Sequence, residues 1–325
     1  MFVEQGFKGR YQWYNYLAGT LIIFLLFFIA QGLVGAYINL KASQSENPVS
    51  IINAPLAEVM KASELSPNFI VFLLLFSFVF GMAGIYIAIK YLHGRSLKSL
   101  ITIRDKIDWK RFLLSFGLMA GFVIISTLVA YYYAPENFEL QFQLFPFMIL
   151  LLISITLVPI QVAFEEILFR GYLMQGFGII FKNRWVPLLF TSVFFGLMHG
   201  SNPEVAALGK TLLVYYIGTG LFLGIITLMD DGIELALGFH TANNLIQILL
   251  VTSNYSVFQS PSILKEISEP TGAWAEIIIP IFILYPLFII IFSKKYKWTN
   301  WKEKLTGKVN FPTIALDPTK NHPEG

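Results

Sequence analysis

The chain has 325 residues, of which 56% are apolar and only 13% are charged, and its mean hydropathy is +0.65. A soluble domain carries about 25% charged residues, so this composition excludes a soluble domain and predicts a membrane protein whose main partner is the lipid bilayer. The net charge of +3 is too small to indicate a nucleic-acid partner. The absence of Cys excludes disulfides, thiolate nucleophiles, iron–sulfur clusters and cysteine-type zinc sites.

Eight apolar stretches follow one another along the chain, each close to the roughly 20 residues that cross a bilayer. We therefore expect an all-α fold, a polytopic membrane bundle of about eight transmembrane helices. These helices form a single domain over residues 1–292, followed by a basic tail, 293–325, that we expect to be largely disordered. The predicted spans are Leu17–Ile38, Asn68–Ile89, Phe112–Tyr133, Phe145–Val162 (with an alternative end at Phe181), Trp185–His199, Thr211–Met229, Gly232–Val251 and Ala273–Phe292.

The basic residues predict the orientation of these spans. The chain has 23 Lys and Arg. If eight spans begin from a cytoplasmic N-terminus, all of these residues lie on inner segments except Lys41, Lys61, Lys210 and Lys265. Cytoplasmic loops of membrane proteins carry such an excess of Lys and Arg. We therefore expect both termini in the cytoplasm and the protein in the cell membrane.

Three groups of polar residues inside the apolar spans are the candidates for function, because an ionisable group in the hydrocarbon costs on the order of 3 kcal/mol. The first group contains Glu165, Glu166 and Arg170. On a helix, Glu166 and Arg170 are four residues apart and can pair. Glu165 lies about 100° further round the helix axis and its carboxylate stays free. The alternative interpretation is a helix end at the membrane interface, where such charges are ordinary.

The second and third groups contribute histidines. His199 follows Phe195 by four residues near the end of one span, where it is either a catalytic residue or an ordinary interfacial histidine. His240 and Asn244 are one helical turn apart on one face of the seventh predicted span. Their alternative role is hydrogen bonding between helices. His93 and His322 lie in a basic loop and in the tail, and we expect no role for either.

Taken together, these groups give Glu-Glu-x-x-x-Arg, Phe-x-x-x-His and His-x-x-x-Asn, in this order on three helices. This arrangement over residues 145–250 resembles the CPBP family of intramembrane proteases (Abi-like proteins), which includes CAAX prenyl endopeptidases and bacteriocin-processing or immunity proteins. The resemblance implies an intramembrane endopeptidase acting on membrane-embedded or lipidated peptides. It implies catalytic roles for Glu165, His199, His240 and Asn244, and substrate-binding or structural roles for Glu166, Arg170 and Phe195.

The residue types also suit this chemistry when they are considered without the family. Peptide hydrolysis needs an activated water and a group that stabilises the oxyanion. Glu165 is the better base, since Arg170 occupies Glu166, and His199 can share the proton of the water. His240 and Asn244 can both donate a hydrogen bond to an oxyanion.

Three alternatives remain open on the sequence alone. Glu165, His199 and His240 could bind zinc, but the chain has no His-Glu-x-x-His motif, so we expect no metal or other cofactor. The same Glu, Arg and His could form a proton or ion relay in a transporter or channel. The chain could also be a non-catalytic member of the family that acts by binding, as in bacteriocin immunity.

The depth of the groups in the membrane poses a difficulty. Twenty residues separate Phe145 from Glu165, or about 30 Å of helix, which puts Glu165 at the cytoplasmic end. His199 lies about 24 Å from the same face. We therefore expect Pro159 to kink or break the fourth helix, and Gly171–Phe181 to lie partly in the membrane and draw Glu165 deeper.

Overall fold

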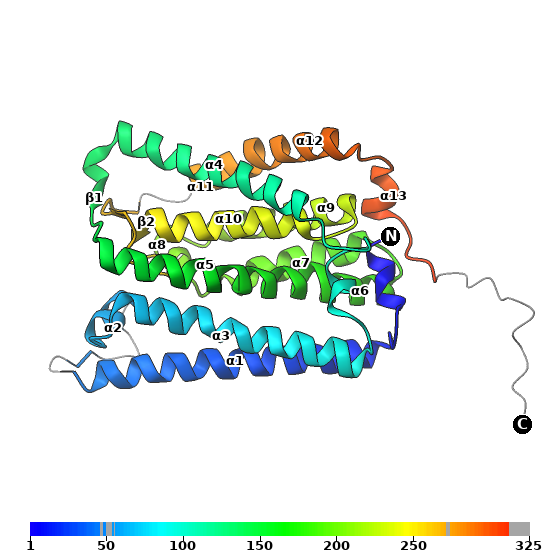
Figure 1. Ribbon diagram of the computed structural model, residues 1–325, viewed down its shortest axis with the longest axis horizontal. Coiled ribbons are helices and arrows are strands. Elements are labelled where there is room, and N and C mark those ends of the chain that lie inside the picture. The colour runs from blue at the N-terminus through cyan, green and yellow to red at the C-terminus, as the bar shows by residue number, and fades with distance from the viewer. Residues whose placement is uncertain (46–47, 50–53, 55, 271–273, 312–325) are drawn as a thin grey trace, which may run out of the picture.

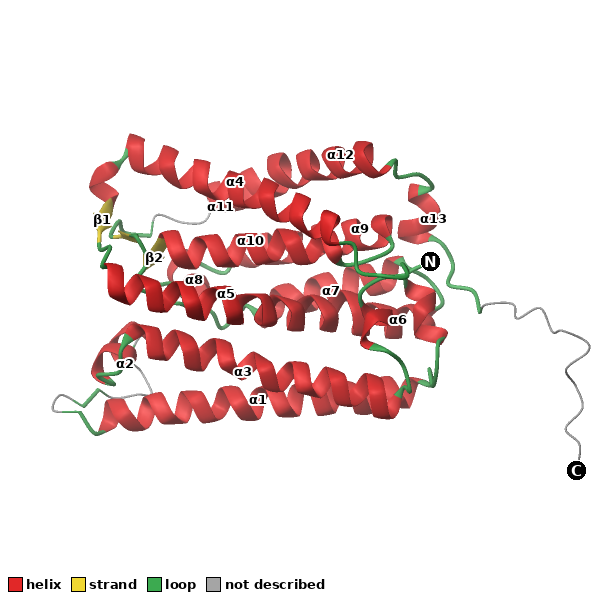
Figure 2. Cartoon of the chain, in the orientation of Figure 1, coloured by secondary structure: helices red, strands yellow, loops and turns green. Residues whose placement is uncertain are grey.

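Long apolar helices form the fold, because a helix satisfies its own backbone hydrogen bonds and can therefore be surrounded by lipid. The structure is a computed structural model that describes residues 1–45, 48, 49, 54, 56–270 and 274–311. The long helices run in the same direction or opposite to one another along the length of the molecule (Figure 1). The N-terminus, α6 and α13 lie at one end of the bundle, and α2, β1 and β2 lie at the other (Figure 2).

Six helices are long and apolar enough to cross a membrane, which confirms the predicted helical membrane bundle and makes this a multi-pass integral membrane protein. They coincide with the first, second, third, fourth, sixth and eighth predicted spans, although Ala273 lies outside the described residues. The helices at the fifth and seventh predicted spans, α7 (Trp185–Met198) and α10 (Glu234–Leu250), have 14 and 17 residues and are shorter. The number of eight spans therefore stays a prediction. The six helices are Trp13–Ser43 (α1), Pro67–Leu92 (α3, Pro67–Ile87, and a π-helical turn, Ala88–Leu92), Trp109–Tyr133 (α4), Leu144–Phe181, Leu212–Asp230 (α9) and Ile277–Tyr296.

The fourth of these helices is continuous, and it explains the depth of the candidate residues. It consists of α5 (Leu144–Glu166), a π-helical turn (Ile167–Leu173) and α6 (Met174–Phe181). Pro159 lies inside α5 and does not break it, so the break we expected there is wrong. A proline removes one backbone hydrogen bond, which a long helix packed on both sides tolerates. Glu165 lies near the middle of the 38-residue helix because Gly171–Phe181 extends that helix.

Three short strands close one end of the bundle, a feature that the all-α prediction did not include. β1 (Phe138–Leu140) pairs antiparallel with β3 (Leu264–Glu266), and β3 pairs parallel with β2 (Val251–Ser253). Phe138 is paired with Glu266, and Val251 with Leu264. β2 directly follows α10, so the sheet joins the end of α10 to the connection between α4 and α5. Short helices lie beside it at this end, namely α2 (Leu56–Ala62) and α8 (Pro203–Leu208).

The opposite end of the bundle is tied together by ion pairs. Asp230, at the end of α9, accepts hydrogen bonds from Arg104 Nη2 at 2.9 Å and Arg111 Nε at 2.8 Å. Arg104 also donates to Glu234 at the start of α10, at 3.1 Å. These contacts fix the turn from which α10 enters the bundle.

The 3₁₀ turns are Val3–Phe7, Leu97–Leu100 and Pro135–Asn137. The last helical segments are α11 (Trp274–Ile279), a π-helical turn (Pro280–Leu284), α12 (Tyr285–Tyr296) and α13 (Trp301–Thr306).

The first part of the tail, up to residue 311, is more ordered than we expected. Residues 293–296 complete α12, and α13 follows. Lys304 Nζ lies 2.6 Å from Asp231 Oδ2, and Glu303 Oε1 lies 2.9 Å from Arg184 Nη1. These two ion pairs attach the tail to the bundle. Residues 312–325 lie outside the described residues.

The loop after α3, which contains His93 and Arg95, contacts the Leu144–Phe181 helix that carries the first motif. His93 is fully buried, and its Nε2 lies 2.9 Å from the hydroxyl of Tyr172. Burial lowers the pKa of His93 to about 4, so this imidazole is neutral at physiological pH. Arg95 donates to Gln175 Oε1 at 2.6 Å. The loop after α3 therefore holds the second half of the Leu144–Phe181 helix, although the sequence indicated no role for His93.

A close approach of two backbones positions α10. A Cβ atom at Gly238 would lie 2.2 Å from the carbonyl oxygen of Phe112 in α4, so only glycine fits there without a shift of one helix. Gly121, also in α4, has open space around the same position. A substitution at Gly121 can therefore serve as the control for the same substitution at Gly238.

We predict that Gly238→Ala lowers thermal stability, because overpacking typically costs about 1–3 kcal/mol. Gly121→Ala is expected to be neutral or stabilising, since Ala favours a helix over Gly by about 1 kcal/mol. Thermal unfolding of the detergent-solubilised variants measures both effects. An equal unfolding temperature for Gly238→Ala and wild type would contradict the close approach.

Candidate active site

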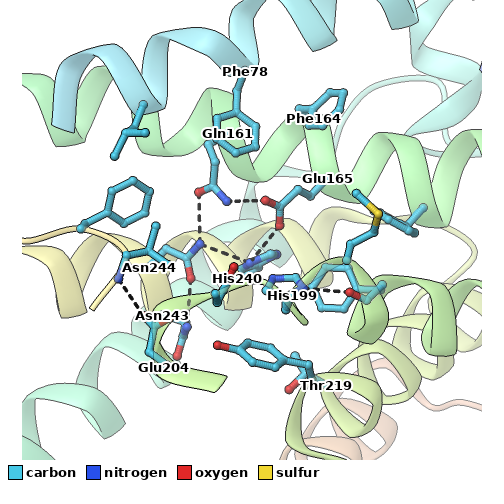
Figure 3. A pocket seen from close by; sticks show the side chains of 18 of the residues that line it. Phe78, Gln161, Phe164, Glu165, His199, Glu204, Thr219, His240, Asn243 and Asn244 are labelled. Atoms are coloured by element: carbon cyan, nitrogen blue, oxygen red, sulfur yellow. Dashed lines mark hydrogen bonds and ion pairs between the residues drawn. The ribbon is translucent and has the colours of Figure 1, made fainter. Parts of the chain in front are cut away.

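Three separate helices bring the predicted residues to one cavity of about 550 Å³ (Figure 3). Glu165 lies in the last turn of α5, next to the π-helical turn. His199 is the C-cap of α7, and His240 and Asn244 lie on one face of α10. All four line the cavity, so the structure brings together the residues that the sequence placed on three different helices.

Glu166 is the buried centre of the site. Its Oε1 atom accepts hydrogen bonds from Arg170 Nη1 at 2.9 Å and from His240 Nδ1 at 2.8 Å. Glu166 is 0% exposed and Arg170 is 1% exposed. Because a carboxylate oxygen only accepts, Nδ1 of His240 carries the proton. The expected contact between Glu166 and Arg170 is therefore present, and Glu166 additionally joins α5 to α10.

Phe195 packs against this cluster. The guanidinium of Arg170 lies over the Phe195 ring, with its Cζ atom 4.4 Å from the ring centre. Arg170 Nη2 also donates to the carbonyl oxygen of Gly220, at 3.3 Å. Arg170 is thus occupied by Glu166, an aromatic face and a backbone carbonyl, and it is not among the residues that line the cavity.

Glu165 takes part in a different set of hydrogen bonds. Its Oε1 accepts from Gln161 Nε2 at 2.6 Å, and its Oε2 lies 3.6 Å from His240 Nε2. Asn244 Nδ2 donates to Gln161 Oε1 at 3.1 Å and lies 3.3 Å from His240 Nε2. Glu165 Oε2 has no hydrogen-bond partner among the described residues. The two neighbouring carboxylates therefore differ, since Glu166 accepts from a cation and Glu165 is held only by a neutral amide.

Gln161 is a site residue that our sequence interpretation missed. It lies one helical turn before Glu165 on the same face of α5, and it connects Glu165 to Asn244. A polar residue four positions before a candidate base, inside an apolar helix, was the available signal.

The His199 ring is oriented by its own helix and by an aromatic neighbour. Its Nδ1 lies 2.8 Å from the carbonyl oxygen of Phe195, which can only accept, so Nδ1 carries a proton and a neutral ring has its lone pair on Nε2. The ring stacks on Tyr216 with centres 4.3 Å apart. No sequence pattern connected Tyr216, on α9, with His199.

The cavity has an aromatic part and a polar part. The Phe27, Phe78 and Phe164 rings pack against one another and line the aromatic part. Polar side chains line the other part, among them Glu204 and Asn243, to which we had assigned no role (Figure 3). The arrangement can therefore bind an apolar group next to a polar, hydrogen-bonding chain.

The side chains do not form an evident metal site. Within the described part of the chain, no group of three or more His, Asp and Glu side chains is arranged to hold a metal ion. The alternative zinc ligands, Glu165, His199 and His240, thus line one cavity without converging as metal ligands do. We derive no step that uses a metal.

We predict that Arg170→Met lowers the unfolding temperature, because loss of one partner leaves the buried Glu166 carboxylate without its cation. Breaking a buried pair in this way typically costs about 3–5 kcal/mol. The double variant Glu166→Gln with Arg170→Met is expected to recover part of the loss. Thermal unfolding of Arg170→Met, Glu166→Gln and the double variant in detergent is the measurement, and a double variant whose loss equals the sum of the two single losses would contradict the pairing.

Comparisons with known proteins agree with the motifs. Residues 142–246 match the family model described as type II CAAX prenyl endopeptidase Rce1-like. The uncharacterized protein YyaK of Bacillus subtilis (strain 168) is 30% identical over 200 residues, which cover 61% of this chain and 66% of that protein, just under two thirds of its length. No solved structure matches. Residues 142–246, which contain all three motifs, therefore form a domain of the Rce1-like type II CAAX prenyl endopeptidase family.

Proposed function

We propose that this protein is an intramembrane endopeptidase that hydrolyses membrane-embedded or lipidated peptides with a water activated by Glu165. The observation that carries the proposal is that Glu165, His199, His240 and Asn244 all line one cavity within the membrane helices. Residues 142–246, which supply these four side chains, match the family model of Rce1-like type II CAAX prenyl endopeptidases. An activated water, groups that stabilise an oxyanion and an apolar wall are what such a hydrolysis needs.

Glu165 is the base in this proposal. Each of the two carboxylates has an Oε2 atom without a hydrogen-bond partner among the described residues, but only Glu165 lines the cavity, whereas Glu166 is fully buried and its Oε1 accepts from Arg170 and His240. A base must be free to accept the proton of a water. His199 supports it, since its Nδ1 donates to Phe195 and leaves the Nε2 lone pair to orient the same water. The proton taken from water would then pass to the leaving amine.

His240 and Asn244 stabilise the oxyanion in this proposal. Asn244 Nδ2 and His240 Nε2 lie 3.3 Å apart, close enough for both to reach one oxygen atom. Glu166 accepts from Nδ1 of His240 and would stabilise the imidazolium, in which Nε2 becomes a donor. Gln161 holds the Asn244 amide at 3.1 Å, so that the donor is oriented before the substrate binds.

Two other functions, transport and peptide binding without cleavage, can be tested with the same purified protein. In a transporter, the chain from Glu166 through His240, Asn244 and Gln161 to Glu165 would conduct protons, but it begins and ends on neighbouring residues of α5. Flux into proteoliposomes would identify that function. In a non-catalytic member, a fluorogenic peptide would bind without being cleaved.

We propose further that the protein works without a metal, in the cell membrane, with both termini in the cytoplasm.

We predict that Glu165→Gln abolishes cleavage of a fluorogenic peptide by the purified protein, while expression and unfolding temperature stay unchanged. Gln keeps the shape of Glu but cannot accept the proton, and loss of a general base typically costs about 10²–10⁴ in rate. Glu139→Gln, on the exposed strand β1, is the matched control. A Glu165→Gln variant that retains more than about a tenth of the rate would exclude Glu165 as the base.

We predict that Asn244→Ala lowers kcat by about 10²–10³ with little change in KM, because an oxyanion donor acts mainly in the transition state. Steady-state kinetics with the same peptide measures the two constants separately. Gln141→Ala, whose amide donates to Ser260 and Ser262 and which does not line the cavity, is the control and is expected to retain the wild-type kcat. An unchanged kcat in Asn244→Ala would remove the oxyanion assignment.

A further inference from the structure

The cavity that contains Glu165 has an unbalanced charge. Among the described residues, its lining includes a second carboxylate, Glu204, but no Lys or Arg. Glu204 lies on α8, outside the long apolar helices, and Figure 3 shows it in a different part of the cavity from Glu165. Tyr216 is within electrostatic range of both carboxylates. A peptide that extends across the cavity therefore meets a carboxylate side chain in two places.

Glu204 is only partly satisfied by the protein. Its Oε1 accepts from the backbone N–H of Val257 at 2.9 Å, which attaches the loop after β2 to α8. Its Oε2 is buried and has no hydrogen-bond partner among the described residues. Burial raises the pKa of Glu204, although the Val257 N–H acts in the opposite direction. A buried carboxylate without a cation is costly, and a positively charged ligand would remove that cost.

The basic residue nearest to the catalytic groups does not balance this charge. The guanidinium of Arg170 is already bound by Glu166 and by the carbonyl oxygen of Gly220, and Phe195 covers one face of it. A cationic substrate group therefore meets two carboxylates in the cavity and no competing Lys or Arg among its described lining residues, whereas an acidic group meets carboxylates of its own sign. Charges interact strongly where water is excluded, so this difference in sign discriminates between substrates.

We propose that Glu204 is a specificity-determining residue that binds an amine or guanidinium group of the peptide substrate. The inference rests on the proposed endopeptidase activity and names its substrate class. The substrate is a membrane-associated segment with a Lys or Arg close to the scissile bond, next to apolar residues that enter the phenylalanine-lined part of the cavity.

The test uses fluorogenic peptides that share one apolar sequence and differ in a single residue, which is Lys, norleucine or Glu. This residue is placed in turn at successive positions on both sides of the scissile bond, and each peptide has an amidated C-terminus. At the best position, we expect the Lys peptide to exceed the norleucine peptide in kcat/KM by about tenfold, the effect of one favourable ion pair, and the Glu peptide to be cleaved more slowly than both.

Glu204→Gln should remove this preference. Gln can still accept from Val257 N–H, so the loop stays attached, and the kcat/KM values of the Lys and norleucine peptides should become equal within about twofold. The readout is the ratio of the two kcat/KM values, which does not depend on the absolute activity of the variant. Glu204→Asp, which retains the charge, should keep part of the preference. Glu139→Gln, which removes an exposed carboxylate outside the cavity, should leave the preference unchanged.

Binding separates this inference from the proposed function. The affinities of the Lys and norleucine peptides are measured by fluorescence anisotropy on Glu165→Gln protein, with and without Glu204→Gln. Equal affinities and equal kcat/KM for the Lys, norleucine and Glu peptides would overturn the inference and leave the protease standing, provided that cleavage depends on Glu165. Tighter binding of the Lys peptide that depends on Glu204, without any cleavage, would support the cation site and overturn the proposed protease.

Discussion

The carboxylate of Glu166 is the contact on which the arrangement of the site depends. It is completely buried, and a single oxygen accepts from both Arg170 and His240, so α5 and α10 are joined by charge inside an apolar bundle. A buried carboxylate is stable only where cations or donors surround it. The register of α5 against α10 is therefore constrained, and this register determines where Glu165 and Asn244 lie.

The hydrogen bonds around Glu166 also distinguish the two neighbouring carboxylates. His240 Nδ1 donates a hydrogen bond to Glu166, Asn244 donates one to Gln161, and Gln161 donates one to Glu165. Each group thereby has an assigned role as donor or acceptor. Both carboxylates have an oxygen without a hydrogen-bond partner among the described residues, but only Glu165 lines the cavity, which suits its proposed role as the base.

Contacts far from the cavity keep α10 and the long helix in position. Asp230 and Glu234 hold Arg104 at the turn between α9 and α10, and Gly238 lets α10 approach α4 closely. At the other end of α10, Glu204 attaches the loop after β2 to α8. Thus a side chain on the polar part of the cavity contributes both to the closure of that end and to the charge that a substrate would meet.

The sequence by itself predicted the helical membrane fold and the residues of the three motifs, whereas only the tertiary structure decided how these residues are connected and which others join them at the cavity. Apolar length and i,i+4 spacing are local properties, and they predicted the long helices and the pairing of Glu166 with Arg170. The contact between Glu166 and His240 joins residues 74 positions apart, which no local pattern specifies. The continuous helix through Pro159, the stacking of Tyr216 on His199 and the burial of His93 likewise depend on neighbours distant in sequence. A chain reveals which groups can react, but packing between helices decides which of them meet.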